Sequence, residues 1–238
     1  MPHPVAGHCL IALNNEEVMS IGGIDANGWS LNETWIYNIN NDTWRPGKQM
    51  SHSRYYHGCS WISDSRDHRF IIVAGGTVGE YRKRYQYYYW SDQYEYYWYD
   101  NTTYHDHDCY DQSDYYWYDN TTDHYHDCYD QYDFDWYDNT TLTETVEVYD
   151  PITNTWLEVN PLPEALSGSQ LIEDGKGGVL MIGGDNVGTF SEYRGRGDVS
   201  DIYYLSGKDG TWKKSFKVID IPRQFHVAML IPDSFVKC

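Results

Sequence analysis

Three short apolar runs, each stopped by a pair of glycines, recur along the chain. They are VMSIGG ending at Gly23, FIIVAGG ending at Gly76 and GVLMIGG ending at Gly184. Apolar, β-branched residues followed by Gly-Gly are typical of a buried strand that ends in a sharp break. The first two runs end 53 residues apart, but the next two end 108 residues apart. The pattern therefore predicts a repeated β unit with an extra segment inside its second copy.

The extra segment is a tandem repeat. Trp98, Trp117 and Trp136 lie 19 residues apart in near-identical strings, YWYDNTT twice and DWYDNTT once. Three 19-residue units amount to 57 residues, and without them 51 residues separate the second and third glycine pairs. Because 51 and 53 nearly agree, we interpret these units as an expansion inside one copy of a repeat of about 50 residues.

Each copy carries further shared residues. A strand ending in tyrosine follows the glycine pair and a tryptophan comes next, at Tyr37 and Trp44, Tyr149 and Trp156, and Tyr204 and Trp212. An Arg-x-x-His string begins two copies, at Arg54 and His57 and again at Arg223 and His226, whereas the third copy has Ser167 where the others carry histidine. Four strands per repeat with these markers resemble kelch repeats.

The resemblance implies an all-β fold, a kelch-type β-propeller in which each repeat is a four-stranded antiparallel blade. The chain holds three full blades and the start of a fourth, and propellers typically close with four to eight. We therefore expect an incomplete arc, and three interpretations stay open: a fragment of a larger propeller, a shortened gene product, or a chain that closes by self-association. The expected division is residues 1–80 for blade 1 and half of blade 2, 81–141 for the insertion, and 142–238 for the rest.

The insertion differs sharply in composition from the blades. Residues 81–141 hold 18 of the 25 tyrosines, and residues 91–141 contain fourteen Asp or Glu but no Lys or Arg. This segment supplies most of the net charge of −19. Nucleic acid is not expected as a partner, because phosphate binding needs clustered cations. Alternating polar and aromatic residues predict a disordered or collapsed loop.

Two histidine-rich strings in the insertion are candidate metal ligands. The side chains concerned are His105, His107, Cys109, His124, His126 and Cys128. Zinc accepts nitrogen and sulfur ligands of this kind. Their spacing matches no standard zinc motif, however, and low-complexity Cys/His tracts bind metals adventitiously. No cofactor is predicted, and metal binding through the insertion stays an alternative function.

The cysteines and the chain start favour a reducing, cytoplasmic setting. Cys9 and Cys59 begin equivalent strands, where buried free thiols are expected. Residues 1–9 lack the features of a signal peptide, and no apolar run is long enough to span a membrane. Secretion remains the alternative because five Asn-x-Ser/Thr sequons are present, at Asn32, Asn41, Asn101, Asn120 and Asn139.

The kelch resemblance implies a non-enzymatic module that binds a protein partner. In such blades the links from second to third strand, and from one blade to the next, lie at the same end and often carry partner-binding loops. We expect contacts from Arg54, Tyr55 and Tyr56 before blade 2 and from Arg223 before blade 4, with arginine pairing to acidic groups. The alternative is a metal-binding or extracellular glycosylated protein that acts through the insertion.

Overall fold

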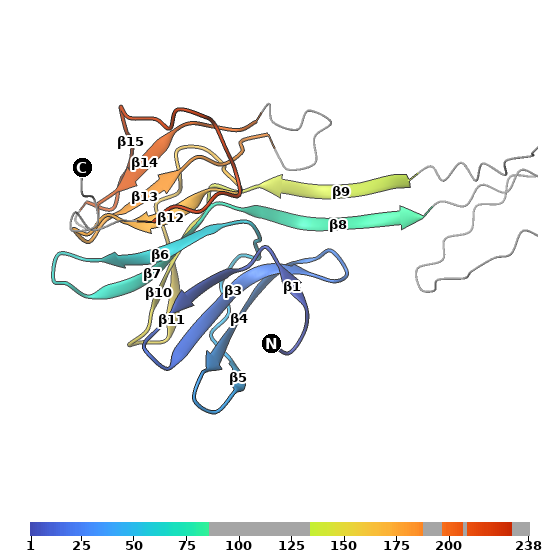
Figure 1. The fold of residues 1–238 in the computed structure, drawn as a ribbon, viewed down its shortest axis with the longest axis horizontal. Coiled ribbons are helices and arrows are strands. Elements are labelled where there is room, and N and C mark those ends of the chain that lie inside the picture. Colours follow the sequence, from blue (N-terminus) through green and yellow to red (C-terminus); the bar gives the residue numbers. More distant parts are fainter. Residues whose placement is uncertain (86–133, 188–196, 207–208, 230–238) are drawn as a thin grey trace, which may run out of the picture. The chain divides into compact units, whose positions relative to one another are not determined.

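The computed structural model describes residues 1–85, 134–187, 197–206 and 209–229 (Figure 1). The chain divides into two compact units, one comprising Met1–Arg82 with Asp138–Cys238 and the other Lys83–Tyr137. In the described ranges every regular element is a β-strand, which confirms the all-β prediction. No helix in these ranges could cross a membrane.

Blade 1 is an antiparallel meander. Its strands follow one another in the order β2 (Cys9–Ala12), β3 (Glu17–Asp25), β4 (Ser30–Asn38) and β5 (Thr43–Pro46). The short β1 (Val5–Ala6) pairs with the far end of β3 and makes the sheet five-stranded. Each consecutive pair of these strands is joined by a short turn.

Blade 2 contains the insertion between its second and third strands. Its sheet runs β6 (Gly58–Ser63), β7 (Arg69–Ala74), β10 (Val146–Asp150) and β11 (Thr155–Val159). Between β7 and β10, the strands β8 (Thr77–Tyr85) and β9 (Phe134–Leu142) pair as a separate two-stranded sheet (Figure 1). Blade 3 repeats the meander with β12 (Gln170–Glu173), β13 (Val179–Ile182), β14 (Ile202–Leu205) and β15 (Trp212–Lys214).

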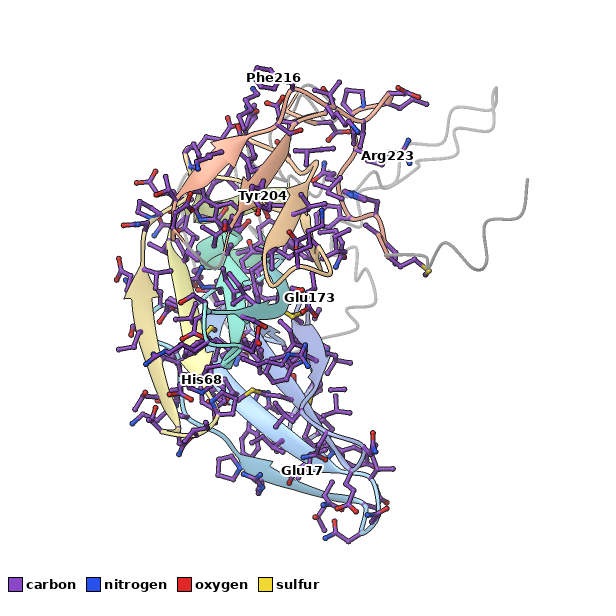
Figure 2. All side chains as sticks on the ribbon, turned by 90° about the vertical axis from the view of Figure 1, so that its left-hand side faces the viewer. Glu17, His68, Glu173, Tyr204, Phe216 and Arg223 are labelled. Atoms are coloured by element: carbon purple, nitrogen blue, oxygen red, sulfur yellow. A yellow bond between two sulfur atoms is a disulfide. The ribbon has the colours of Figure 1, made fainter. Side chains whose placement is uncertain are left out.

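Blade 2 packs against both other blades (Figure 2). Its strand β7 reads as an unbroken apolar run because both of its faces are covered. Ile71 and Val73 join a buried cluster with blade 1, whereas Ile72 and Ala74 join a second cluster with blade 3. All four side chains are fully buried. Burying an isoleucine or valine contributes about 1.5–3 kcal/mol, so these two layers hold the blades together.

The glycine pairs make the joints between blades. All six glycines of the three pairs have positive φ, a region that favours glycine. The second glycine of each pair donates its N–H to the linker that leads into the next blade. The bonds are Gly23 to Arg54 O at 2.8 Å, Gly76 to Leu166 O at 2.7 Å and Gly184 to Arg223 O at 2.9 Å. A Cβ on the first glycine of each pair would collide with the same carbonyl oxygen.

The ends of the predicted insertion are ordered strands rather than irregular chain. Strand β8 continues past residue 80, and β9 contains residues 134–141. The start of β8 is held by the link between β3 and β4, since Gly79 N–H donates to Ser30 Oγ at 3.0 Å and Tyr81 N–H to Gly28 O at 2.8 Å. Residues 86–133, with most of the tandem repeat, lie outside the described residues, so the proposed division at 80 and 141 stays a prediction.

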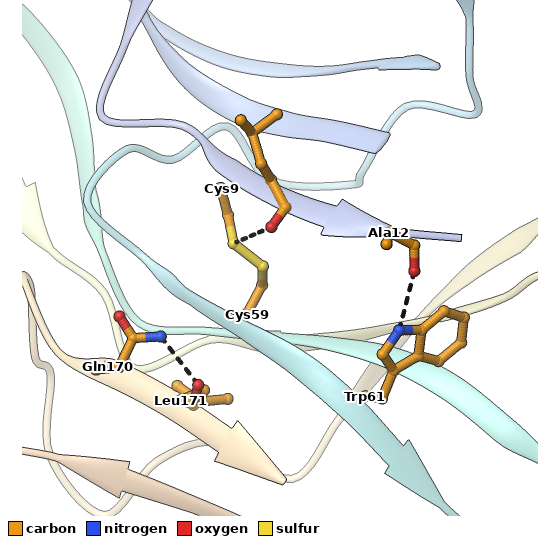
Figure 3. Close-up of a disulfide and its surroundings, with 7 residues drawn as sticks. Cys9, Ala12, Cys59, Trp61, Gln170 and Leu171 are labelled. Atoms are coloured by element: carbon orange, nitrogen blue, oxygen red, sulfur yellow. Dashed lines mark hydrogen bonds between the residues drawn. A yellow bond between two sulfur atoms is a disulfide. The ribbon is translucent and has the colours of Figure 1, made fainter. Parts of the chain in front are cut away.

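A disulfide joins the first strands of blades 1 and 2, so the prediction of free thiols at Cys9 and Cys59 was wrong (Figure 3). Cys9 pairs with Ile21 and Cys59 with Val73, one place further along. The true counterpart of Cys9 is Gly58. Because side chains alternate between the faces of a strand, this offset turns the two sulfur atoms toward each other.

A contact equivalent to the Cys9–Cys59 disulfide lies between blades 2 and 3. There Gly58 faces Leu171, whose side chain fills the space that a Cβ on Gly58 would need. In the repeat, Gly58 corresponds to Cys9 and Leu171 to Cys59. An apolar contact thus takes the place of the disulfide at the second joint.

Candidate protein-binding face

A strip of backbone hydrogen bonds crosses from blade to blade. Tyr56 N–H donates to Gly7 O at 2.8 Å, Gly168 N–H to Tyr56 O at 2.8 Å, and Phe225 N–H to Gly168 O at 2.9 Å. These four residues, which we call the central strip, each lie just before a first strand or its equivalent. All four have left-handed φ angles between 53° and 66°. The segments that lead into the blades therefore share one backbone conformation at this position.

Two residues of the central strip are aromatic. A non-glycine residue in the left-handed region costs roughly 1–3 kcal/mol and persists only when surrounding contacts hold it. A Cβ on Gly7 would lie 2.8 Å from the ring of Tyr56, and one on Gly168 would lie 3.2 Å from the ring of Phe225. The rings of Tyr56 and Phe225 also contact each other edge to face, with centroids 4.6 Å apart. Each ring thus occupies the space that a neighbouring glycine leaves.

The links between second and third strands lie at the same end as the central strip. Tyr55 forms a β-bridge with Thr77, and Ser167 forms one with Asp185. The hydroxyls of Thr77 and Ser167 are 2.8 Å apart, which ties two of these bridges together. We call the central strip, these links and Arg223, which lies two residues before Phe225, the loop end. Trp29, in the link of blade 1, is 44% exposed there.

Arg54 is buried rather than presented to a partner. Its guanidinium donates to Glu147 Oε2 at 2.9 Å, to Thr145 O and Thr145 Oγ1 at 2.8 Å each, and to Gly75 O at 3.0 Å. The side chains of both ions are 0% exposed. Burial lowers the pKa of Arg54, and the charge of Glu147 opposes that shift.

Glu147 binds the linker a second time. Its carboxylate accepts from the backbone N–H of Ser51 at 2.7 Å and from that of His52 at 3.3 Å. The ion pair therefore fastens the linker of blade 2 to strand β10. Tyr55 is also only 1% exposed and packs on Tyr56, so neither Arg54 nor Tyr55 lies at the surface, and contact of either with a partner stays a prediction.

Arg223 holds the equivalent place before the fourth blade but is exposed (Figure 2). Its Nε donates to Ile221 O at 3.1 Å, and the described residues give it no ion pair. Tyr56 is half-buried. Of the four predicted contact residues, Tyr56 and Arg223 thus remain at the surface.

Phe225 was missed by the sequence reading. It is 52% exposed and completes the aromatic pair with Tyr56. A signal was present, because an aromatic residue precedes the histidine of both Arg-x-x-His strings.

The recurring histidines are structural. A Cβ on Gly22 would lie 3.0 Å from the ring of His57, and one on Gly183 would lie 2.9 Å from the ring of His226. Burial, followed by the charges of Arg54 and His8, lowers the pKa of His57 to about 3. The counterpart in blade 3 is Ser169 rather than Ser167, since Ser169 follows the central strip directly and donates from Oγ to Gly183 O at 2.8 Å.

His105, His107, Cys109, His124, His126 and Cys128 lie outside the described residues. Within the described part of the chain, no three His, Cys, Asp or Glu side chains gather as a metal site.

Comparison with known proteins identifies one repeat. Residues 136–163, which include β10 and β11, match the family model described as the Kelch motif. No curated protein matches the chain. A solved structure described as "Structure of YjhT" is similar, with 11% identity, a TM-score of 0.49 and coverage of 90% of this chain and 47% of that chain. This chain thus spans about half the length of that structure. Residues 136–163 of blade 2 thus carry a kelch motif, and blades 1 and 3 repeat the strand order and the glycine-pair joint of blade 2.

Proposed function

We propose that the chain is a non-enzymatic interaction module that binds a protein partner through its loop end. The observation that carries this proposal is the aromatic pair of Tyr56 and Phe225, two residues held in left-handed backbone conformations. Such conformations concentrate at functional sites. Aromatic side chains supply much of the binding energy of protein interfaces, and the exposed Trp29 adds to the apolar area at this end.

Arg223 gives the proposed interface a charge preference. The guanidinium of Arg54 is buried and hydrogen-bonded to Glu147 and to backbone oxygens, whereas the guanidinium of Arg223 is exposed. An exposed guanidinium forms charge-assisted, often bidentate bonds with carboxylates. We therefore expect a partner that offers an acidic side chain beside an apolar surface.

Replacing Phe225 with alanine is expected to raise the dissociation constant for such a partner by at least about 30-fold, as an interface hot spot does. Proteins that copurify with the chain from its source cells would be compared between the parent and Phe225→Ala, and the dissociation constant of the affected partner would then be measured by calorimetry. Ile152→Ala is a matched control, because Ile152 is 78% exposed in the turn between β10 and β11, at the opposite end of the blade. Equal binding by all three proteins would refute the proposal.

The disulfide favours a second candidate, an extracellular glycoprotein. Cytoplasmic thiols are normally kept reduced, whereas disulfides persist in secreted proteins. Of the two sequons in blade 1, Asn41 is exposed in the turn between β4 and β5, and Thr43 Oγ1 donates to Asn41 Oδ1 at 2.5 Å. Asn32 is half-buried and its Nδ2 donates to Met50 O at 3.1 Å. Asn41 is thus the better placed acceptor for a glycan.

Expression through a eukaryotic secretory pathway should attach a glycan to Asn41 and not to Asn32. In a parent chain with Asn101, Asn120 and Asn139 all changed to glutamine, glycosidase treatment should lower the mass. Asn41→Gln should abolish that loss and Asn32→Gln should leave it unchanged. Alkylation of free Cys9 and Cys59 in protein from its native source would contradict this second candidate.

A further inference from the structure

Residues 219–229 repeat the path of the chain into a blade. Gly184 N–H donates to Arg223 O as Gly23 N–H does to Arg54 O, at 2.9 and 2.8 Å. His226 packs against Gly183 as His57 packs against Gly22. Phe225 is the fourth member of the central strip. The segment is therefore already seated on blade 3 in the position of a first strand.

Among the described residues, no strand covers this segment as one covers its counterpart in blade 2. In blade 2, Gly58–Ser63 pairs with β7, and Gly58, Cys59 and Ser60 are all buried. The equivalent Val227 and Met229 are 82% and 70% exposed. No strand pairs with residues 226–229 in the described part of the chain. We call residues 225–229 the open edge.

An unpaired strand edge with apolar side chains is a template for pairing with another chain. Exposure along the open edge alternates, with Phe225, Val227 and Met229 exposed and the residues between them half-buried. This is the pattern of an extended strand with one face on the protein and the other uncovered. An added strand would satisfy its backbone groups and cover its apolar side chains.

We infer that the open edge pairs antiparallel with the open edge of a second copy of this chain. A two-fold interface uses the same residues from both subunits. Centred on Val227, such pairing sets Val227 opposite Val227 and Phe225 opposite Met229, which are apolar pairs that stabilise a sheet. The edge reads Phe-His-Val-Ala-Met, so no charged residues are brought face to face.

The two proposed contacts share Phe225, which belongs to both the loop end and the open edge. Val227 and Met229 belong to the open edge alone, whereas Tyr56 and Arg223 lie outside it, so the lysine test uses Val227 and Met229. Because both apolar side chains are largely exposed, lysine at these two positions should leave the fold intact and prevent pairing, since charged side chains protect natural edges. The thermal midpoint of the variant provides that check.

The test is the mass of the full chain in solution, measured by light scattering after gel filtration from about 1 to 100 µM, a range that brackets ordinary dimer affinities. The parent should become a dimer as concentration rises, and Val227→Lys with Met229→Lys should remain a monomer. Ile152→Lys with Leu157→Lys, which charges exposed apolar positions of blade 2, should dimerise as the parent does. Amide exchange of residues 226–229 should slow in the parent dimer.

A parent that stays monomeric throughout this range would overturn the inference. So would a dimer that survives both lysines at the open edge, or one that the control pair abolishes equally. Slowed amide exchange confined to other segments would also overturn it, because the dimer would then use a different surface.

Discussion

Replacing Arg54 with alanine is expected to lower the free energy of unfolding by about 3–5 kcal/mol, the usual cost of breaking a buried ion pair. The change leaves the Glu147 carboxylate at 0% exposure without its cation, and it also frees the carbonyl oxygens of Gly75 and Thr145. Chemical denaturation followed by tryptophan fluorescence would measure the loss, because Trp156 lies in the core between blades 1 and 2.

Two further variants test whether the loss comes from the buried ion pair of Arg54 and Glu147. Arg66→Ala removes an arginine that also pairs with a carboxylate, at 3.3 Å from Asp64, but is 85% exposed, so its cost should stay below about 1 kcal/mol. Arg54→Met combined with Glu147→Leu should recover most of the loss, since apolar residues of similar size often replace a buried ion pair without penalty. A loss at Arg54 no larger than that at Arg66 would show that the pair does not fasten the linker.

Removing the disulfide is the second change with a large expected effect. The bond closes a loop of 50 residues, for which chain-entropy arguments give about 4 kcal/mol, and measured values are commonly 2–4 kcal/mol. Cys9→Ala with Cys59→Ala should therefore unfold at clearly lower denaturant than the oxidised parent. The parent should lose the same amount on reduction, whereas reducing agent should leave the variant unchanged.

A different outcome would change the account of this joint. If reduction did not alter the unfolding midpoint of the parent, the contact between Cys9 and Cys59 would act as ordinary packing. It would then resemble the contact of Gly58 with Leu171 at the second joint.

The strand order of each blade could be read from the sequence. Strands β7 and β13 are local apolar runs that end at a glycine pair, whereas β3 continues past its pair to Asp25 with a register shift between Ile21 and Gly23. A signal of this kind needs no knowledge of distant residues. The same holds for the place of the insertion, because the spacing of the glycine pairs reveals it. The composition of the insertion did not predict β8 and β9, because Asp and Asn residues disfavour strands and neither segment shows the pairing by itself.

The burial of the four predicted contact residues could not be predicted from the sequence. Arg54 and Arg223 occupy the same motif, yet one is buried and the other exposed. The difference comes from Glu147, which lies 93 residues after Arg54 and across the insertion. The sequence does not indicate the ion pair of Arg54 and Glu147, because only the packing of the linker on strand β10 brings the two charges together.

By itself, the sequence determined the all-β repeat, the strand order that its copies share and the position of the insertion, because these depend on local patterns and their spacing. Only the tertiary structure decided which members of the repeated motifs face solvent. The offset of one residue that turns Cys9 toward Cys59 is a matter of register between neighbouring strands. The contact of Tyr56 with Phe225 joins linkers far apart in the chain. Both are set by how one blade packs on the next, since burial and pairing are properties of the assembled layers.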